Sequence, residues 1–204
     1  GETVTSEVFR LDSLRVVAPT RYAVLGAGEL VGTERDDASA MTTHTFQASA
    51  VRDVTVTVGD IKTVERRVAG SVVHVGAPVD RADSLDRLAD AVADSVTRVS
   101  DYLGPVPDKD IWVSVIPDQT EGIEFPGAMQ LGNLDPDKDR WLITHEVAHL
   151  WFYGLVGNNQ ALHPWLDESF ASFVQRVVDD PQQDPRPSGA ASRSSSAEDG
   201  WPMA

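Results

Sequence analysis

The first third of the chain alternates short apolar runs with glycine, proline and polar residues. Such runs, rich in valine and threonine and bounded by turn residues, are typical of β-strands. They are SLRVVAP, YAVLGAGEL, THTFQASAV, RDVTVTVG and SVVHVGAP. Within the fourth run, Val54, Val56 and Val58 alternate with threonines, which indicates a strand with one buried face. We therefore predict that residues 1–76 form β-sheet.

The spacing of apolar residues changes after Pro78. From Asp83 to Leu103 they recur every three or four positions, which predicts a helix that Gly104 ends. The further predicted elements are a strand over residues 111–117, an extended segment over 121–131 broken at Pro126, and helices over 140–155 and 165–178. Together these elements predict an α+β fold.

The order of the elements also suggests how the chain is divided. A length of 204 residues allows one large domain or two small ones. We place a β domain over residues 1–76 and a domain that contains the helices over residues 77–180. Residues 181–204 are rich in serine, proline and alanine, a composition typical of a disordered tail.

Charge and cysteine content exclude several kinds of function. The formal net charge of −15 argues against a nucleic-acid partner, because the phosphate backbone requires clustered lysine and arginine. No apolar run approaches the ~20 residues that span a membrane. The chain has no cysteine, so a metal ion would have to be held by histidine and carboxylate. The same absence is the one feature that favours an exported or cell-envelope location; the sequence leaves the oligomeric state open.

His145, Glu146 and His149 form the pattern H-E-x-x-H within the predicted helix over 140–155. Residues four apart lie on the same helix face, so two imidazoles can bind one zinc ion with bonds of about 2.0–2.1 Å. Glu168 lies in the next helix, where an antiparallel return would bring it back to the metal. The alternative is a packed helix with incidental polar residues, but unpaired buried polar groups cost several kcal/mol.

Two stretches, HEVAHLWFYGLVG and PWLDESFA, resemble the zinc signature of the M1 family of zinc metallopeptidases (gluzincin aminopeptidases). The runs YAVLGAGELVG and THTFQASAVRDVTVTVG are similar to the end of the β domain that precedes the thermolysin-like catalytic domain in that family. The resemblance thus implies part of an N-terminal β domain over residues 1–76 and the N-terminal half of a thermolysin-like domain over 77–180.

The same resemblance implies a function and a set of site residues. His145, His149 and Glu168 would hold one Zn²⁺ per chain, and Glu146 would be the general base. The expected activity is zinc-dependent hydrolysis of peptide substrates, as an aminopeptidase. EGIEFPG stands where the family has its GxMEN segment, so Glu124 would bind the free α-amine of the substrate. The alternative for Glu124 is an edge-strand residue that faces solvent.

The sequence also departs from the family pattern. Phe125 replaces the asparagine of GxMEN, which leaves an endopeptidase as an alternative. No tyrosine follows Glu168 to stabilise an oxyanion, and we assign Tyr153 to packing rather than catalysis. The helical region that closes the cleft in the family has no counterpart either, so the chain resembles a truncated M1 protein. A non-catalytic binding protein of the same fold is the second alternative. Asp167 either orients a ligand or is an acidic residue stabilised by the helix dipole.

Overall fold

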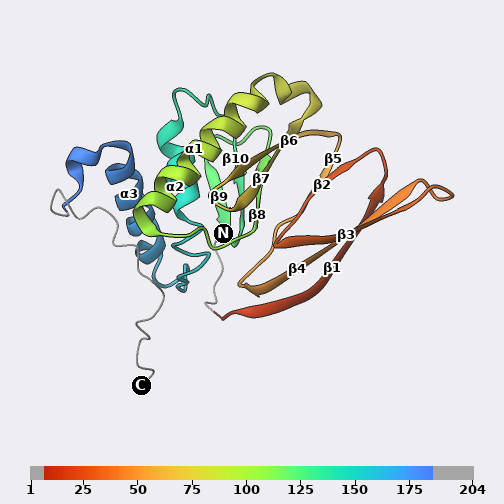
Figure 1. The fold of residues 1–204 in the computed structure, drawn as a ribbon, viewed down its shortest axis with the longest axis horizontal. Helices are drawn as coiled ribbons and strands as arrows, with labels where there is room; N and C mark the ends of the chain where they lie inside the picture. Colours follow the sequence, from red (N-terminus) through yellow and green to blue (C-terminus); the bar gives the residue numbers. More distant parts are fainter. Residues whose placement is uncertain (1–6, 186–204) are drawn as a thin grey trace.

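The computed structural model describes residues 7–185, except for the side chains of residues 81–83. Its N-terminal part is an antiparallel three-stranded sheet in the order β1-β4-β3, which extends away from the helices (Figure 1). The strands are β1 (Phe9–Pro19), β3 (Glu29–Asp36) and β4 (Met41–Val51). Two short strands, β2 (Ala23–Leu25) and β5 (Thr57–Gly59), form a separate antiparallel pair.

A five-stranded sheet forms the centre of the second part, in the order β6-β7-β8-β10-β9. The strands are β6 (Ile61–Val68), β7 (Ser71–Pro78), β8 (Asp110–Val115), β9 (Gly122–Phe125) and β10 (Ala128–Leu131). The three central strands are parallel, and β6 and β9 are antiparallel edges. Because β7 pairs with β8, this sheet crosses the boundary that we placed between residues 76 and 77.

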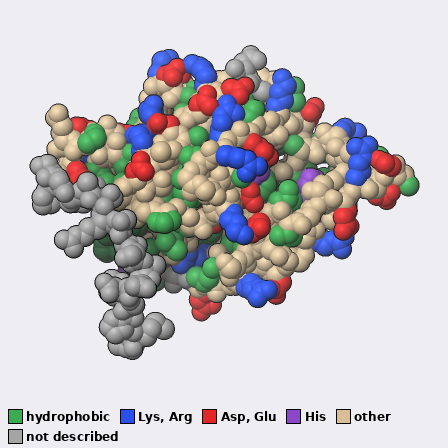
Figure 2. All heavy atoms as spheres, in the orientation of Figure 1, with side chains coloured by type: hydrophobic (Ala, Val, Ile, Leu, Met, Phe, Trp, Pro, Cys, Tyr) green, Lys and Arg blue, Asp and Glu red, His purple; other side chains and the backbone are tan. Residues whose placement is uncertain are grey.

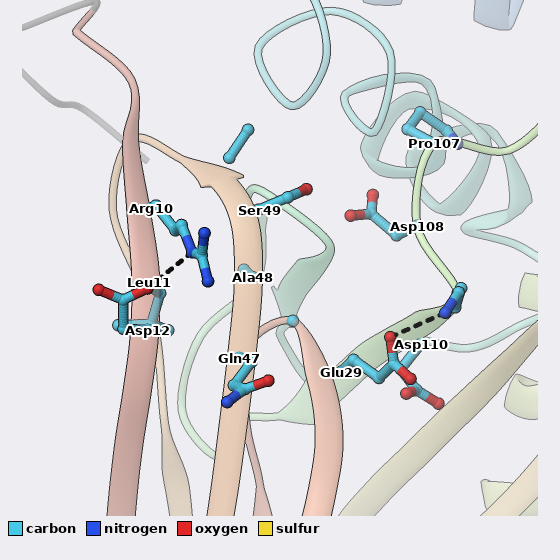
Figure 3. Close-up of a pocket in the computed structure, with 13 residues that line it drawn as sticks. Arg10, Leu11, Asp12, Glu29, Gln47, Ala48, Ser49, Pro107, Asp108 and Asp110 are labelled. Carbon is cyan, nitrogen blue, oxygen red and sulfur yellow. Dashed lines mark hydrogen bonds and ion pairs between the residues drawn. The ribbon is translucent and has the colours of Figure 1, made fainter.

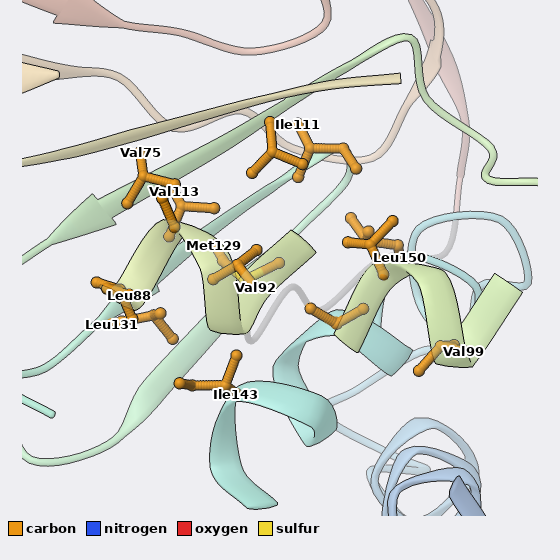
Figure 4. Close-up of a cluster of buried hydrophobic side chains, with 14 of the residues drawn as sticks. Val75, Leu88, Val92, Val99, Ile111, Val113, Met129, Leu131, Ile143 and Leu150 are labelled. Carbon is orange, nitrogen blue, oxygen red and sulfur yellow. The ribbon is translucent and has the colours of Figure 1, made fainter. Parts of the chain in front are cut away.

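Helices pack on this sheet and enclose the main core. They are α1 (Leu85–Leu103), α2 (Arg140–Ala148) and α3 (Trp165–Asp179), with the short 3₁₀ segments η1 (Val79–Ser84) and η2 (Pro181–Gln183). Figure 4 shows Val92 of α1 and Ile143 of α2 among the buried side chains of the sheet. Both side chains are fully buried, so packing in this core fixes the position of α2 against the sheet. None of the helices within residues 7–185 has the length and apolarity that crossing a membrane would require.

A smaller core joins the N-terminal sheet to the second part. Phe46 of β4 is fully buried and lies edge-on to Trp112 of β8, with ring centroids 5.5 Å apart. The indole Nε1 of Trp112 donates a hydrogen bond of 2.7 Å to the carbonyl of Gly28. An added Cβ at Gly26 would lie 2.2 Å from the Phe46 ring, so the backbone passes close to this aromatic pair.

Next to this junction, the two parts border a cleft of about 580 Å³ (Figure 3). β1 and β4 form one wall, and the loop that leads to β8 forms the other. Lys109 of this loop and Glu29 of β3 form an ion pair of 3.0 Å across the cleft. On the face in Figure 2, acidic and basic side chains are interspersed over both parts. Ion pairs between opposite charges, such as Arg66 with Asp90, are consistent with that mixture.

The structure confirms most of the predicted elements, including the α+β class, the helix that ends at Leu103 and the helix over 165–178. Two predictions were wrong in detail. Val54 and Val58 do not face a core, since they are 37% and 44% exposed and the strand begins only at Thr57. The other is the end of α2, described below. The segment over 121–131 is extended and broken at Pro126 as expected, and its two halves, β9 and β10, pair as a hairpin. Most of the predicted tail, residues 186–204, lies outside the described residues.

Candidate metal centre and active site

Two helices bring three potential metal ligands together. The Nε2 atoms of His145 and His149, in the last turn of α2 and directly after it, are 3.2 Å apart. Glu168, in the first turn of α3, places Oε2 at 3.2 Å from Nε2 of His145 and Oε1 at 3.9 Å from Nε2 of His149. Tetrahedral zinc with bonds of about 2.0–2.1 Å separates its ligand atoms by about 3.3–3.4 Å. The donor set and its spacing therefore fit a zinc ion.

The path of the chain after α2 corrects the predicted helix over 140–155. The helix ends at Ala148. The N–H groups of Leu150 and Trp151 then bond three residues back, and those of Gly154 and Leu155 bond five residues back, to His149 and Leu150. This wider turn replaces the α-helical bonds that the continuing apolar pattern predicted. A Cβ at Gly154 would lie 2.4 Å from the Leu150 carbonyl oxygen, so a glycine permits the turn.

The same turn orients His149. The carbonyl of Phe152 lies 3.0 Å from Nδ1 of His149, and because a carbonyl only accepts, Nδ1 must carry the proton. In the neutral imidazole Nε2 is then unprotonated, and it is directed at the candidate metal position, the arrangement that a ligand histidine requires. His149 is almost fully buried, and this burial lowers the pKa of its imidazole. The side chain of Glu168 is 52% exposed, so the site opens to solvent on the α3 side.

Glu146 lies beside these ligands in an enclosed position. Its side chain is buried, and its Oε2 has no hydrogen-bond partner within the described part of the chain. Burial raises the pKa of Glu146 to about 8. A Cβ at Gly122 would lie 2.2 Å from the Glu146 carboxyl group, which shows how closely β9 covers it. Glu146 thus has an oxygen without a partner in an enclosed position beside the three potential ligands.

Glu124 lies on β9 and belongs to the same cluster. One ligand atom each from Glu124, Glu146 and His149 lie within 4.8 Å of one another. Glu124 is only 8% exposed, so the alternative of a solvent-facing edge residue does not apply. Its Oε1 accepts a hydrogen bond of 2.5 Å from Nε2 of Gln160.

The loop between α2 and α3 supplies residues that the sequence did not point to. Gln160 also donates to Asp167 at 2.6 Å, and Asn158 donates to the same carboxylate at 2.9 Å. Asp167 is therefore the residue around which this loop is organised, next to Glu168 in the first turn of α3. Asn and Gln in a GNNQ loop are common surface residues, so only the folded loop shows that they connect Glu124 to α3.

Tyr153 follows the metal-ligand helix in an unusual conformation. Its φ of 98° is positive, which is rare for a residue other than glycine, and its side chain is fully buried. It forms a side-chain hydrogen bond with Asp53, whose own pKa is raised mainly by burial. The burial supports the assignment of Tyr153 to packing. Asp53 and its neighbour Arg52 come from the N-terminal part and were not among the predicted site residues.

Comparisons with known proteins identify similar sequences. Residues 135–197 match the family described as Peptidase family M1 domain. Over 137 residues, 59% of this chain, the sequence is 29% identical to endoplasmic reticulum aminopeptidase 1 of Mus musculus, of which it covers 14%.

Solved structures of similar fold are also M1 zinc metallopeptidases. That of Deinococcus radiodurans superposes with a TM-score of 0.64 at 21% identity, over 83% of this chain and 40% of the other. A mutant of the same organism's enzyme, bound to a Tyr-Ser-Ala substrate, gives 0.65 at 20% identity, over 84% and 41%. These findings confirm the fold and the resemblance to M1 zinc metallopeptidases; the chain spans about two fifths of each structure.

Proposed function

Given the resemblance to M1 zinc metallopeptidases, we propose that this chain carries the zinc site and general base of a metallopeptidase that removes N-terminal residues from peptides. One observation carries the proposal. The Nε2 atoms of His145 and His149 and the carboxylate of Glu168 converge, with nearest separations of 3.2–3.9 Å, beside a buried carboxyl group with an unpartnered oxygen. His145, His149 and Glu168 are the proposed ligands, and Glu146 is the proposed base.

The chemistry divides between the ion and the protein. Zinc with three protein ligands supplies an open position, a Lewis acid and a lowered pKa for a water, near 7. Glu146 takes the proton of the attacking water at its free oxygen, Oε2, and later delivers it to the leaving amine. The buried position of Glu146 keeps competing solvent from that oxygen.

Glu124 gives the proposal its exopeptidase character. Its buried carboxylate lies within 4.8 Å of ligand atoms of Glu146 and His149. The α-amine and the scissile carbonyl carbon of one residue are only about 2.5 Å apart, so an amine held by Glu124 keeps that carbonyl close to the proposed metal position. A protonated α-amine at this point would compensate a carboxylate that is costly to bury. Gln160 holds the other side of the carboxylate and fixes its direction. Phe125 at the asparagine position favours the endopeptidase alternative, which cleavage of N-acetylated peptides would reveal.

The first experiment is the metal content of the purified chain, measured by elemental analysis. We expect about one zinc per chain and its loss in His149→Ala. His163→Ala is the matched control, because His163 is exposed on the loop before α3 and should retain the metal. A folded protein without zinc, or equal zinc in His149→Ala and wild type, would contradict the proposal. Zinc in a chain that hydrolyses no peptide would favour the non-catalytic binding protein.

A further inference from the structure

An arginine of the N-terminal part reaches the turn that follows the proposed ligand helix. Arg52 directly follows β4, and its Nη1 donates hydrogen bonds of 2.8 Å to the carbonyls of both Tyr153 and Gly154. The adjacent Asp53 bonds the side chain of Tyr153. The two residues that follow β4 therefore both contact Tyr153: Arg52 bonds its backbone carbonyl, and Asp53 bonds its side chain.

The guanidinium of Arg52 occupies a slot that only glycine leaves open. A Cβ at Gly157 would lie 1.9 Å from Nε of Arg52 and 2.1 Å from its Cζ. Nε of Arg52 is buried without a hydrogen-bond partner in the described structure, so the two carbonyls at Nη1 are the contacts that compensate for its loss of water. The contact thus depends on two residues: Arg52 donates the hydrogen bonds, and Gly157 leaves the space that the guanidinium occupies.

The held segment is the one that orients His149. The peptide group between Phe152 and Tyr153 carries the carbonyl that bonds Nδ1 of His149. Rotation about φ of Tyr153 moves that carbonyl, and the observed φ of 98° is one that tyrosine rarely adopts unless its surroundings enforce it. The Phe152 ring also stacks on Phe170 of α3, with centroids 5.1 Å apart. The same turn therefore contacts both ligand-bearing helices.

We propose that Arg52 is a positioning residue of the metal site: by fixing Tyr153, it fixes the Phe152 carbonyl and hence the direction of the His149 imidazole. This inference rests on the proposed zinc site. It gives the N-terminal part a specific task in that site, although none of the proposed ligands lies in it. Residues that orient a ligand histidine typically change metal affinity by about 10–100-fold when they are removed.

The test is zinc affinity by competition with a chelating dye, together with the visible spectrum of the Co²⁺-loaded protein, which reports ligand geometry. Arg52→Met should weaken zinc binding about 10–100-fold and alter the cobalt bands. Arg52→Lys should recover most of the affinity, because an ammonium group can donate to both carbonyls. Gly157→Ala should reproduce the Arg52→Met effect by displacing the guanidinium, with Arg52 itself present.

Arg35→Met is the matched control, since Arg35 is an exposed arginine of β3 in the same sheet and should leave both measurements unchanged. If folded Arg52→Met and Gly157→Ala bind zinc like the wild type with unchanged cobalt bands, the inference is overturned while the zinc site stands. If Arg52→Met does not fold, Gly157→Ala and Arg52→Lys decide the outcome by the same criteria. A wild-type chain that binds no zinc overturns the proposed function itself.

Discussion

The N-terminal sheet and the five-stranded sheet with its helices differ in how they hold their side chains. In β3 of the N-terminal sheet, seven of eight residues are exposed, whereas five of six residues of β8 are buried. Backbone pairing and a small core around Phe46 stabilise the first sheet, whereas a larger core of sheet and helix side chains stabilises the second. Groups that need fixed positions are accordingly found where the core is continuous, on α2, α3 and β9.

The two parts nevertheless meet at defined points. Phe46 and Trp112 join them through a small core, and Arg52 reaches the turn after α2. Under the proposed function, the catalytic residues lie in the second part, and the first part supports one proposed ligand, His149. Substitutions in the two parts should therefore have separable effects on peptide hydrolysis, on zinc binding and on the free energy of unfolding.

The largest effect is expected for Glu146→Gln, which removes the proposed base while keeping the size of the side chain. We expect peptide hydrolysis to fall about 10²–10⁴-fold, since a positioned base contributes about that much. Zinc content should remain at the wild-type level because Glu146 is not a proposed ligand. Turnover and elemental analysis on the same sample test this, and near-normal turnover would remove Glu146 from the role.

Glu124→Ala should have a smaller and more selective effect. A hydrogen bond to a charged group is worth about 1.5–3 kcal/mol, so kcat/KM for peptides with a free N-terminus should fall by roughly 10–100-fold. Binding of the same peptide with an acetylated N-terminus should be unchanged, because that peptide carries no α-ammonium group. Kinetics of the free peptide and competitive inhibition by the acetylated one measure this, and equal losses on both would rule out an amine-binding role.

Truncation of a core side chain in each part tests whether the proposed zinc site depends mainly on the second part. Ile143→Ala in α2 and Phe46→Ala in β4 each remove a fully buried side chain, and each should lower the free energy of unfolding by about 2–5 kcal/mol. Ile143 lies two residues before His145, so its loss should also weaken zinc binding, whereas Phe46→Ala should leave zinc affinity within about threefold. Urea denaturation and zinc titration of the folded proteins give both quantities. Equal zinc loss in the two variants would argue against a site supported mainly by the second part.

How far the sequence predicts this structure depends on the range of the interactions. The H-E-x-x-H spacing and the following glutamate predicted the side chains that converge, because helix periodicity is a local property. The strand β6 was missed since its sequence, IKTVERRV, carries charges at an edge of the sheet, where little is buried. The end of α2 was missed because apolar residues continue beyond Ala148.

The contacts of Arg52 could not have been predicted from the sequence in the same way. Arg52 is separated by 101 and 102 positions in the sequence from Tyr153 and Gly154, and nothing in the local sequence pattern distinguishes this arginine. The same holds for Gln160, which contacts Glu124 across 36 residues. Long-range polar contacts depend on how whole elements are placed, and that placement appears only in the folded chain.

The smallest effect concerns Asp108, in the cleft between the two parts (Figure 3). Burial raises its pKa from 3.8 to about 6, so the folded chain binds this proton more tightly than the unfolded chain. Asp108 therefore costs stability above about pH 6, and this cost decreases as the pH falls and disappears below about pH 4. Asp108→Asn should raise the free energy of unfolding at pH 7.5 by about 1–2 kcal/mol, less than the full shift implies because the side chain is partly exposed.

At about pH 3 the stabilities of Asp108→Asn and wild type should coincide, because the Asp108 carboxyl is then largely neutral in both the folded and the unfolded chain. Asp12→Asn is the matched control, as Asp12 lines the same cleft but is 77% exposed, and it should change stability little at either pH. Urea denaturation at the two pH values measures the difference. A pH-independent effect of Asp108→Asn would mean that its carboxyl is solvated, and hence that the cleft between the two parts is more open to water than its lining indicates.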